Sequence, residues 1–339
     1  MKKNSLLALM LALVLVITGC SGPADEPRDK EKDQAVENLE EEKDVKDKIV
    51  VRSLKGPTSM GMIKLIDDEK SKEDSAYDMD IVTMADEVVG GLAKKEIDIA
   101  ALPANLASVL YNKTDNVEVL AINTLGVVYL VENGDSIKDF SDLKGKTIYA
   151  TGEGQTPDLI LRHLLKANNL EVGKDVNLEF KQEPAEVAAI LAEKEDSLAL
   201  LPEPFISAAS MKNDKIRLGL DLNEEWKKVN DGKDIVTGVV LARKDFIEEN
   251  KDSLEDFLKA YKESVDFVLA NKEEASKLID KYDIVKEPVA LKALEKLNIS
   301  FIDGDKMKDM LSSYLEIISQ EDPKAVGGSL PGPDFYYGQ

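Results

Sequence analysis

The sequence predicts an α/β protein of two lobes, each a mixed, mostly parallel sheet flanked by helices. Short β-branched runs alternate with helical runs of about ten residues, a pattern typical of parallel sheets covered on both faces. The 339 residues are too many for one compact core. Two long apolar, β-rich runs, 125–131 and 235–242, fit strands that cross between the lobes and act as a hinge.

The first lobe is expected to contain residues 48–125 together with 239–339, and the second to contain residues 126–238. The predicted strands of the first lobe are 48–53, 79–84, 96–101 and 117–123, and its predicted helices include 86–95 and 104–111. Residues 246–319 have apolar side chains at helical spacing, so we expect this tail to be helical and to complete the first lobe.

The second lobe is organised around residues 142–165. Residues 147–151 predict a buried strand, 152–155 a turn, and Thr156 an N-cap for the helix that Pro157 opens. Such a unit directs backbone N–H groups at the space beyond the carboxyl end of the strand, where open α/β sheets bind small ligands. We call such a turn, between the end of a strand and the start of a helix, a corner. Similar corners recur at 55–61, 102–105 and 201–205, and we expect all four to face one cleft.

Residues 1–19 have the pattern of an export signal. Lys2 and Lys3 precede the apolar run 6–17, which is short for a spanning helix, and Cys20 is the only cysteine of the chain. The run into Cys20 resembles the lipobox of bacterial lipoproteins, which implies cleavage before Cys20, its lipidation, and anchoring at the extracytoplasmic face of the cell membrane. An ordinary secretory signal or a membrane anchor is the alternative.

Residues 20–47 are dominated by Asp, Glu and Lys, which predicts a disordered tether, with a charged helix over 35–46 as the alternative. The formal net charge of -22 argues against nucleic-acid binding and against electrostatic docking on anionic lipid. The membrane is therefore expected to hold the chain through the lipid anchor only.

No cofactor or metal is predicted. His163 is the only histidine, and we expect it to be a surface or partly packed residue. The glycines of 152–157 lack the third glycine of a dinucleotide fingerprint. Trp226, the only tryptophan, is expected to pack against its own lobe, with stacking on a ligand ring as the alternative.

Five segments carry a resemblance to a known family. They are 95–100 (KEIDIA), 142–148 (DLKGKTI), 203–204 (EP), 239–245 (VVLARKD) and 330–337 (LPGPDFYY). Through them the chain resembles the substrate-binding proteins of ABC importers with the type II periplasmic-binding-protein fold. Within that class it is similar to the nitrate/sulfonate/taurine and thiamine-precursor group, called NMT1/THI5-like. It departs from the pattern at Lys95, which replaces a glycine, and at the glycines around Glu153.

The resemblance implies a small organic ligand held between the lobes and delivered to an ABC permease. The ligand would be a sulfonate, a nitrate-like anion or a thiamine-precursor-like amine. By position the implied ligand-binding residues are Thr58, Ser59, Met60, Pro103, Ala104, Asn105, Asn123, Thr124, Gly154, Gln155, Thr156, Glu203, Pro204, Phe205 and Thr237.

Several of these residues have a structural alternative. Thr58, Ser59 and Thr156 can cap helices, and Asn105 can serve a turn. Glu203 can stabilise a helix start or accept hydrogen bonds from an amine. Because acidic residues outnumber cations in these corners, a neutral or amine-bearing ligand is as well supported as an oxyanion.

Two other functions stay open at this point. One is an enzyme on the same fold with a carboxylate-based lyase or synthase mechanism, although a single histidine leaves no Ser/His/Asp set. The other is a surface sensor that uses the two lobes to bind another protein. The resemblance favours a binding protein that is not an enzyme.

Overall fold

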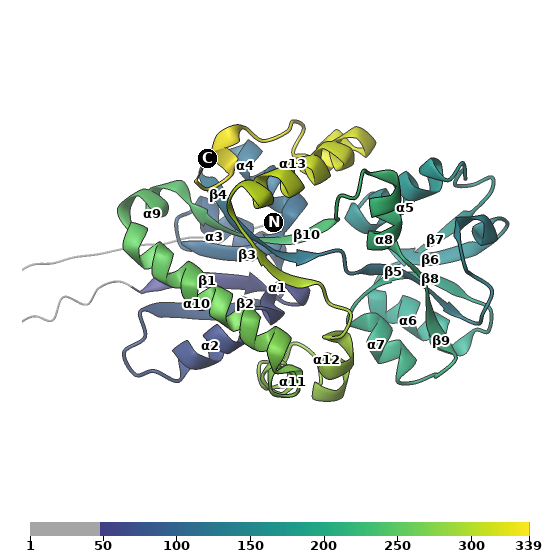
Figure 1. Ribbon diagram of the computed structural model, residues 1–339, viewed down its shortest axis with the longest axis horizontal. Coiled ribbons are helices and arrows are strands. Elements are labelled where there is room, and N and C mark those ends of the chain that lie inside the picture. The colour runs from purple at the N-terminus through teal and green to yellow at the C-terminus, as the bar shows by residue number, and fades with distance from the viewer. Residues whose placement is uncertain (1–47, 339) are drawn as a thin grey trace, which may run out of the picture. The chain divides into compact units, whose positions relative to one another are not determined.

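Two β-sheets with helices packed on them make up the part of the chain that the structure describes, residues 48–338 of a computed structural model (Figure 1). The predicted signal segment, the lipidation residue Cys20 and the tether lie outside the described residues. Both sheets are mixed, as predicted.

The first sheet has six strands in the order β11-β4-β10-β3-β1-β2. Its strands are β1 (Ile49–Leu54), β2 (Tyr77–Val82), β3 (Ile99–Pro103), β4 (Val117–Leu125), β10 (Val236–Arg243) and β11 (Ile299–Ile302). Strands β1, β2 and β3 are parallel, whereas β10 runs antiparallel between β3 and β4. A strand that arrives late in the sequence therefore occupies the interior of this sheet.

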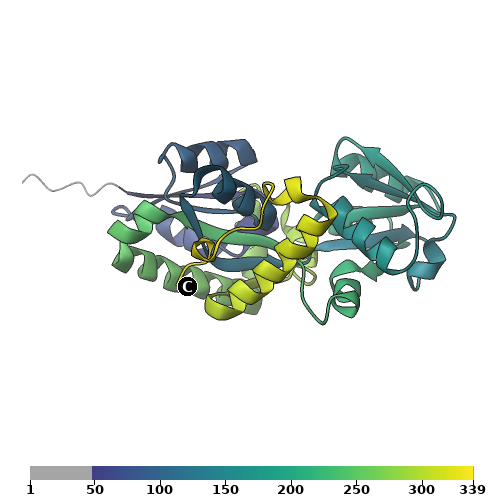
Figure 2. The same ribbon diagram turned by 90° about the horizontal axis from the view of Figure 1, so that it is seen from above.

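The helices that pack on or beside the first sheet come from both ends of the described chain. They are α1 (Pro57–Met60), α2 (Ile63–Lys70), α3 (Ala85–Ala93), α4 (Ala104–Thr114), α9 (Lys244–Glu249), α10 (Lys251–Ala270), α11 (Lys272–Lys281), α12 (Glu287–Ala293) and α13 (Gly304–Glu321). Figure 2 shows α13 lying along the first sheet and reaching toward the helices of the second sheet.

The second sheet has five strands in the order β7-β6-β8-β5-β9, with β5 antiparallel to β8 and β9. Its strands are β5 (Val128–Asn133), β6 (Thr147–Thr151), β7 (Asn177–Lys181), β8 (Leu198–Pro202) and β9 (Ile216–Asp221). Its helices are α5 (Thr156–Ala167), α6 (Pro184–Glu193), α7 (Phe205–Ser210) and α8 (Leu222–Val229). Read from the edge strands β2 and β7, each sheet runs through two parallel neighbours to one antiparallel strand, so the two sheets share one topology.

Short 3-10 turns complete the described chain. They are η1 (Phe140–Leu143), η2 (Pro323–Val326) and η3 (Pro333–Phe335). The predicted strand 147–151 is found with the same bounds as β6. Its buried centre, Ile148 to Ala150, explains why this apolar, β-rich run is a strand between parallel neighbours.

Two sequence predictions about elements were wrong. The run 125–131 is not one continuous strand, because the chain leaves the first sheet after Leu125 and enters the second at Val128. The Asn298 side chain donates a hydrogen bond to the Gly126 carbonyl in this gap, at 2.5 Å. The predicted helical tail contains β11, which adds to the edge of the first sheet by pairing antiparallel with β4.

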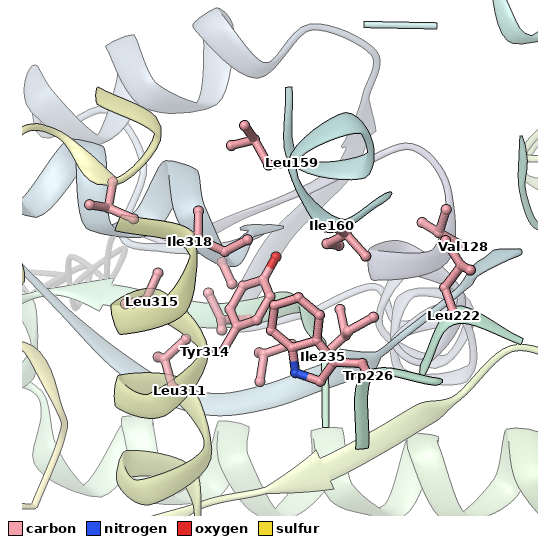
Figure 3. Close-up of a cluster of buried hydrophobic side chains, with 14 of the residues drawn as sticks. Val128, Leu159, Ile160, Leu222, Trp226, Ile235, Leu311, Tyr314, Leu315 and Ile318 are labelled. Atoms are coloured by element: carbon pink, nitrogen blue, oxygen red, sulfur yellow. The ribbon is translucent and has the colours of Figure 1, made fainter. Parts of the chain in front are cut away.

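The core extends without a break from the first sheet to the second. One cluster of buried side chains includes Val119 of β4, Leu164 of α5, Trp226 of α8 and Leu311 of α13. Figure 3 shows the part of this cluster where α13 meets α5 and α8. Apolar burial therefore joins the elements of the two sheets, and not only the chain segments that cross between them.

Candidate solute-binding cavity

A cavity of about 490 Å³ lies between elements of the two sheets. Its size falls within the usual range for small-molecule sites. Its lining residues are Pro103, Asn105, Leu106, Val128, Gly154, Gln155, Thr156, Pro157, Ile160, Thr237, Tyr314 and Ala325. Six of the predicted ligand-binding residues therefore share one hollow: Pro103, Asn105, Gly154, Gln155, Thr156 and Thr237.

The corner between β6 and α5 forms one wall of the cavity. Gly154 has φ +72°, a left-handed conformation that glycine adopts without strain. The Asp158 carboxylate, which is buried, accepts a hydrogen bond from the Gly154 N–H at 2.8 Å and another from Arg162 Nε at 2.7 Å. The Asp158 carboxylate thus lies at the start of α5, where the helix dipole stabilises its negative charge.

The prediction that Thr156 caps α5 was wrong. Thr156 is the first residue inside the helix, and the N-cap position belongs to Gln155, whose side chain makes no capping hydrogen bond. Asp158, in the first turn, accepts from the Gly154 N–H that precedes the N-cap and so fixes the turn before α5 without capping the helix. The Thr156 side chain consequently lines the cavity without being used as a cap.

The opposite wall comes from the first sheet and the C-terminal segment. Pro103 ends β3, and Asn105 lies in the first turn of α4. The Asn105 side chain donates to the Ala325 carbonyl at 3.3 Å, which ties η2 to this wall. Thr237 reaches the cavity from β10, the strand between β3 and β4.

Tyr314 of α13 also lines the cavity, and the sequence analysis missed it. Its ring packs against the Trp226 indole with ring centres 6.0 Å apart, and Figure 3 shows its hydroxyl on the side of Ile160 and Ile318. The residue is 1% exposed, and burial raises the pKa of its hydroxyl, which is therefore protonated at neutral pH. Helical spacing predicted that residues 246–319 are helical but gave no sign of what Tyr314 faces.

The charge of the cavity is close to zero. Its described lining holds five polar side chains, those of Asn105, Gln155, Thr156, Thr237 and Tyr314, and no Asp, Glu, Lys, Arg or His. The remaining lining is aliphatic, proline or glycine. The site can thus offer a solute hydrogen bonds and apolar contact, but no ion pair from its own wall.

Other predicted residues do not line this cavity. Thr58 donates its hydroxyl to the Leu54 carbonyl at 2.8 Å, and Ser59 donates to the Gly56 carbonyl at 2.9 Å. Both lie within the short helix α1, whose N-cap is Gly56. The following helix α2 has Met62 as its N-cap, so the prediction that Thr58 or Ser59 caps it was wrong. Met60 beside them is fully buried. These three residues stabilise the turn after β1, and their contact with a solute stays a prediction.

Asn123 and Thr124 of β4 are also buried away from the cavity lining. The Asn123 side chain donates to the Thr58 carbonyl at 3.1 Å, and Thr124 donates to Asn123 Oδ1 at 3.0 Å. This chain of hydrogen bonds fixes α1 to the first sheet. Ala104, at the start of α4, is buried as well.

Glu203 begins a separate buried corner with Pro204 and Phe205. One carboxylate oxygen, Oε2, accepts from the Ser207 N–H at 3.1 Å, whereas Oε1 has no hydrogen-bond partner among the described residues. Burial raises the pKa of Glu203, and the hydrogen bond from Ser207 opposes that effect. The geometry therefore gives Glu203 the role of a helix-start residue, and its binding of an amine stays a prediction.

His163 is half-buried, as predicted. Its ring nitrogens lie 3.1 Å from Glu321 Oε1 and 3.1 Å from Asn230 Oδ1, and its ring lies against Trp226. Trp226 is 0% exposed and packs against His163 of its own lobe, as predicted, but also against Tyr314 of α13, so the prediction holds only in part. Within residues 48–338 no group of three His, Cys, Asp or Glu side chains is placed to hold a metal ion.

The comparisons with known proteins agree with this arrangement. Residues 114–275 match the family described as NMT1/THI5 like. A crystal structure of an ABC transporter from Parabacteroides distasonis is 26% identical, with a TM-score of 0.72, and the match covers 85% of this chain and 98% of that one. The chain has the fold of the substrate-binding proteins of ABC importers. The type II periplasmic-binding-protein fold expected from the sequence is thus confirmed.

Further solved structures share this binding-protein fold at lower identity. The periplasmic aliphatic sulphonate binding protein SsuA from Escherichia coli is 18% identical, with a TM-score of 0.66, over 86% of this chain and 94% of that one. The ligand-binding component of an ABC-type import system from Staphylococcus aureus, with zinc bound, is 16% identical, with a TM-score of 0.62, over 85% and 95%. No curated protein sequence matches the chain.

The match to an ABC transporter agrees with the prediction of a binding protein that is not an enzyme. None of the described helices is both long enough and apolar enough to span a membrane.

Proposed function

We propose that this chain is the solute-binding component of an ABC importer. It binds a small organic solute in the cavity between the two sheets and delivers the solute to a membrane permease. One observation carries the proposal: corners from both sheets, Pro103 and Asn105 on one side and residues 154–156 on the other, line the same hollow. Solute bound there contacts both halves and favours the arrangement in which they are together.

The expected location is the extracytoplasmic face of the cell membrane, with the chain held by a lipid on Cys20 of the signal-like start. The lobe boundaries in this proposal are 48–125 with 239–339, and 126–238. The similarity to importer components supports the permease as partner, and the signal-like residues 1–19 support export.

The proposal is tested by thermal unfolding of the mature domain with and without deproteinised yeast extract as a mixture of solutes. A solute that binds only the folded state raises the midpoint of unfolding. Leu106→Trp places a larger side chain at a half-buried position of the cavity wall and is expected to abolish the rise. Leu269→Trp, at a position that is 45% exposed in α10, is the matched control and is expected to keep it.

A rise that persists in Leu106→Trp would contradict the proposed site. The absence of any rise in the unsubstituted protein would contradict the proposed function.

A further inference from the structure

The chemistry of the cavity wall restricts the class of solute that it can hold. Solvent is displaced when a solute enters, and an ion without a partner of opposite charge loses much of its hydration energy. The described lining has no cationic side chain to receive an anion and no carboxylate to receive a cation. Only hydrogen bonds and apolar contact remain available from the wall.

Two helix starts border the cavity, those of α4 and α5, and neither supplies a full positive charge, because the dipole of a helix is equivalent to about half an elementary charge at its N-terminus. A free helix N-terminus attracts anions through its N–H groups and its dipole. At α5, however, the buried Asp158 carboxylate already accepts the Gly154 N–H, and Arg162 neutralises Asp158 by an ion pair at 2.7 Å. A sulfonate or nitrate at the start of α5 would therefore find the Gly154 N–H already occupied and no net positive charge beside it.

Tyr314 supplies the complementary feature. Its hydroxyl has no hydrogen-bond partner among residues 48–338, although the side chain is 1% exposed and lines the cavity. The hydroxyl oxygen is not among the fully buried atoms that lack a partner, so it is open to the cavity, where a solute that offers an acceptor can take its hydrogen bond. The aliphatic side chains of Leu106, Val128 and Ile160 line the same space with apolar surface.

Given the proposed binding function, we propose that the solute is uncharged at neutral pH and largely apolar, with a hydrogen-bond acceptor for the Tyr314 hydroxyl. This chain would thus differ in ligand class from the solved relatives that are named for sulfonates. Tyr314 is the residue that determines specificity, because it is the most deeply buried of the polar residues in the described wall.

The test separates deproteinised yeast extract by ion exchange at pH 7 into anionic, cationic and uncharged fractions. Each fraction is added to the unsubstituted protein and to Leu106→Trp, and the midpoint of thermal unfolding is measured. The expected result is a rise with the uncharged fraction alone, lost in Leu106→Trp. A rise with a charged fraction that Leu106→Trp abolishes overturns the solute class and leaves the proposed binding function intact. If no fraction gives a rise that Leu106→Trp abolishes, the binding function itself fails.

A second measurement addresses Tyr314. In Tyr314→Phe the amount of uncharged fraction needed for the half-maximal rise is expected to increase roughly 2- to 12-fold, the value of one hydrogen bond. Tyr337→Phe, at a half-buried tyrosine outside the cavity lining, is the matched control and is expected to leave this amount unchanged. If Tyr314→Phe and the unsubstituted protein need the same amount of uncharged fraction for the half-maximal rise, the proposed role of the hydroxyl is overturned.

Discussion

The rings of Trp226 and Tyr314 lie with their centres 6.0 Å apart, so a residue of α8 and a residue of α13 pack directly on each other. One belongs to a helix of the second sheet and the other to the long C-terminal helix that packs on the first. Their contact lies next to the cavity, because Tyr314 is also part of its wall. Packing between the two halves and the proposed binding of solute therefore depend on the same side chain.

Trp226→Ala is expected to lower the free energy of unfolding by about 3–5 kcal/mol, the usual cost of truncating a large buried aromatic residue. The indole is 0% exposed and contacts both His163 and Tyr314. Denaturant unfolding followed by circular dichroism measures the change. A loss below about 1 kcal/mol would show that the contact between α8 and α13 is not tightly packed.

Gly238→Ala is expected to destabilise the protein by about 1–3 kcal/mol through overpacking. A Cβ at Gly238 would lie 2.5 Å from Asn123 Oδ1 and 2.6 Å from Thr58 Cγ2, in the network that holds α1 on the sheet. Gly90→Ala in α3 is the control, since its Cβ would meet nothing within 4 Å. The control is expected to stabilise by about 0.5–1 kcal/mol, and similar effects of the two substitutions would contradict the prediction.

The stability difference between Glu203→Gln and the unsubstituted protein is expected to depend on pH. Burial raises the pKa of Glu203 in the folded state above its ordinary value of 4.5. Folding therefore favours the protonated acid, and the unsubstituted protein loses stability as the pH rises above that value. Gln stays uncharged at every pH. The stability of Glu203→Gln minus that of the unsubstituted protein should therefore be larger at pH 7 than at pH 4.

Glu195→Gln serves as the control for this prediction. Glu195 is exposed, and its hydrogen bond and ion pair with Lys215 lower its pKa. Its contribution has the opposite sign, since it is present above the ordinary pKa and lost as the pH falls. The same pH trend in both variants would show that the burial of Glu203 is not the cause.

Phe335→Ala is expected to cost about 3–5 kcal/mol, although the residue lies only a few positions from the chain end. Phe335 is 0% exposed and packs edge-on against Tyr111 of α4, and the Tyr111 hydroxyl donates to Asp334 at 2.7 Å. Leu330→Ala, at a position that is 48% exposed, is expected to change stability by less than about 0.5 kcal/mol. The free energy of unfolding of both variants is measured by chemical denaturation. If both lose the same small amount of stability, the C-terminal segment is not part of the cooperative core.

Local patterns in the sequence predicted most of the fold. The strand over 147–151 was placed correctly because its residues are β-branched or apolar and are buried between parallel neighbours. The corners at 103–105 and 154–156 were placed on one cavity because each directly follows a strand of a mostly parallel sheet. In both cases the information lies within a few neighbouring residues.

Features set by distant partners were not predictable in this way. The four residues of β11 lie in a mostly helical region and become a strand because they pair with the edge of β4. Tyr314 reaches the cavity because α13 crosses from the first sheet to α5 and α8, a placement that helical periodicity does not encode. The start of α5 at Thr156, with Gln155 and not Thr156 as the N-cap, was likewise not predictable from the residue types alone.

The position of β10 has a consequence for the order in which the molecule assembles. This strand separates β3 from β4, yet it is made only after every strand of the second sheet. When the chain emerges from its amino end, β3 and β4 have no partner between them until the whole middle region has been released. The earliest half of the molecule is therefore the one completed last, and the second sheet is the unit able to fold first.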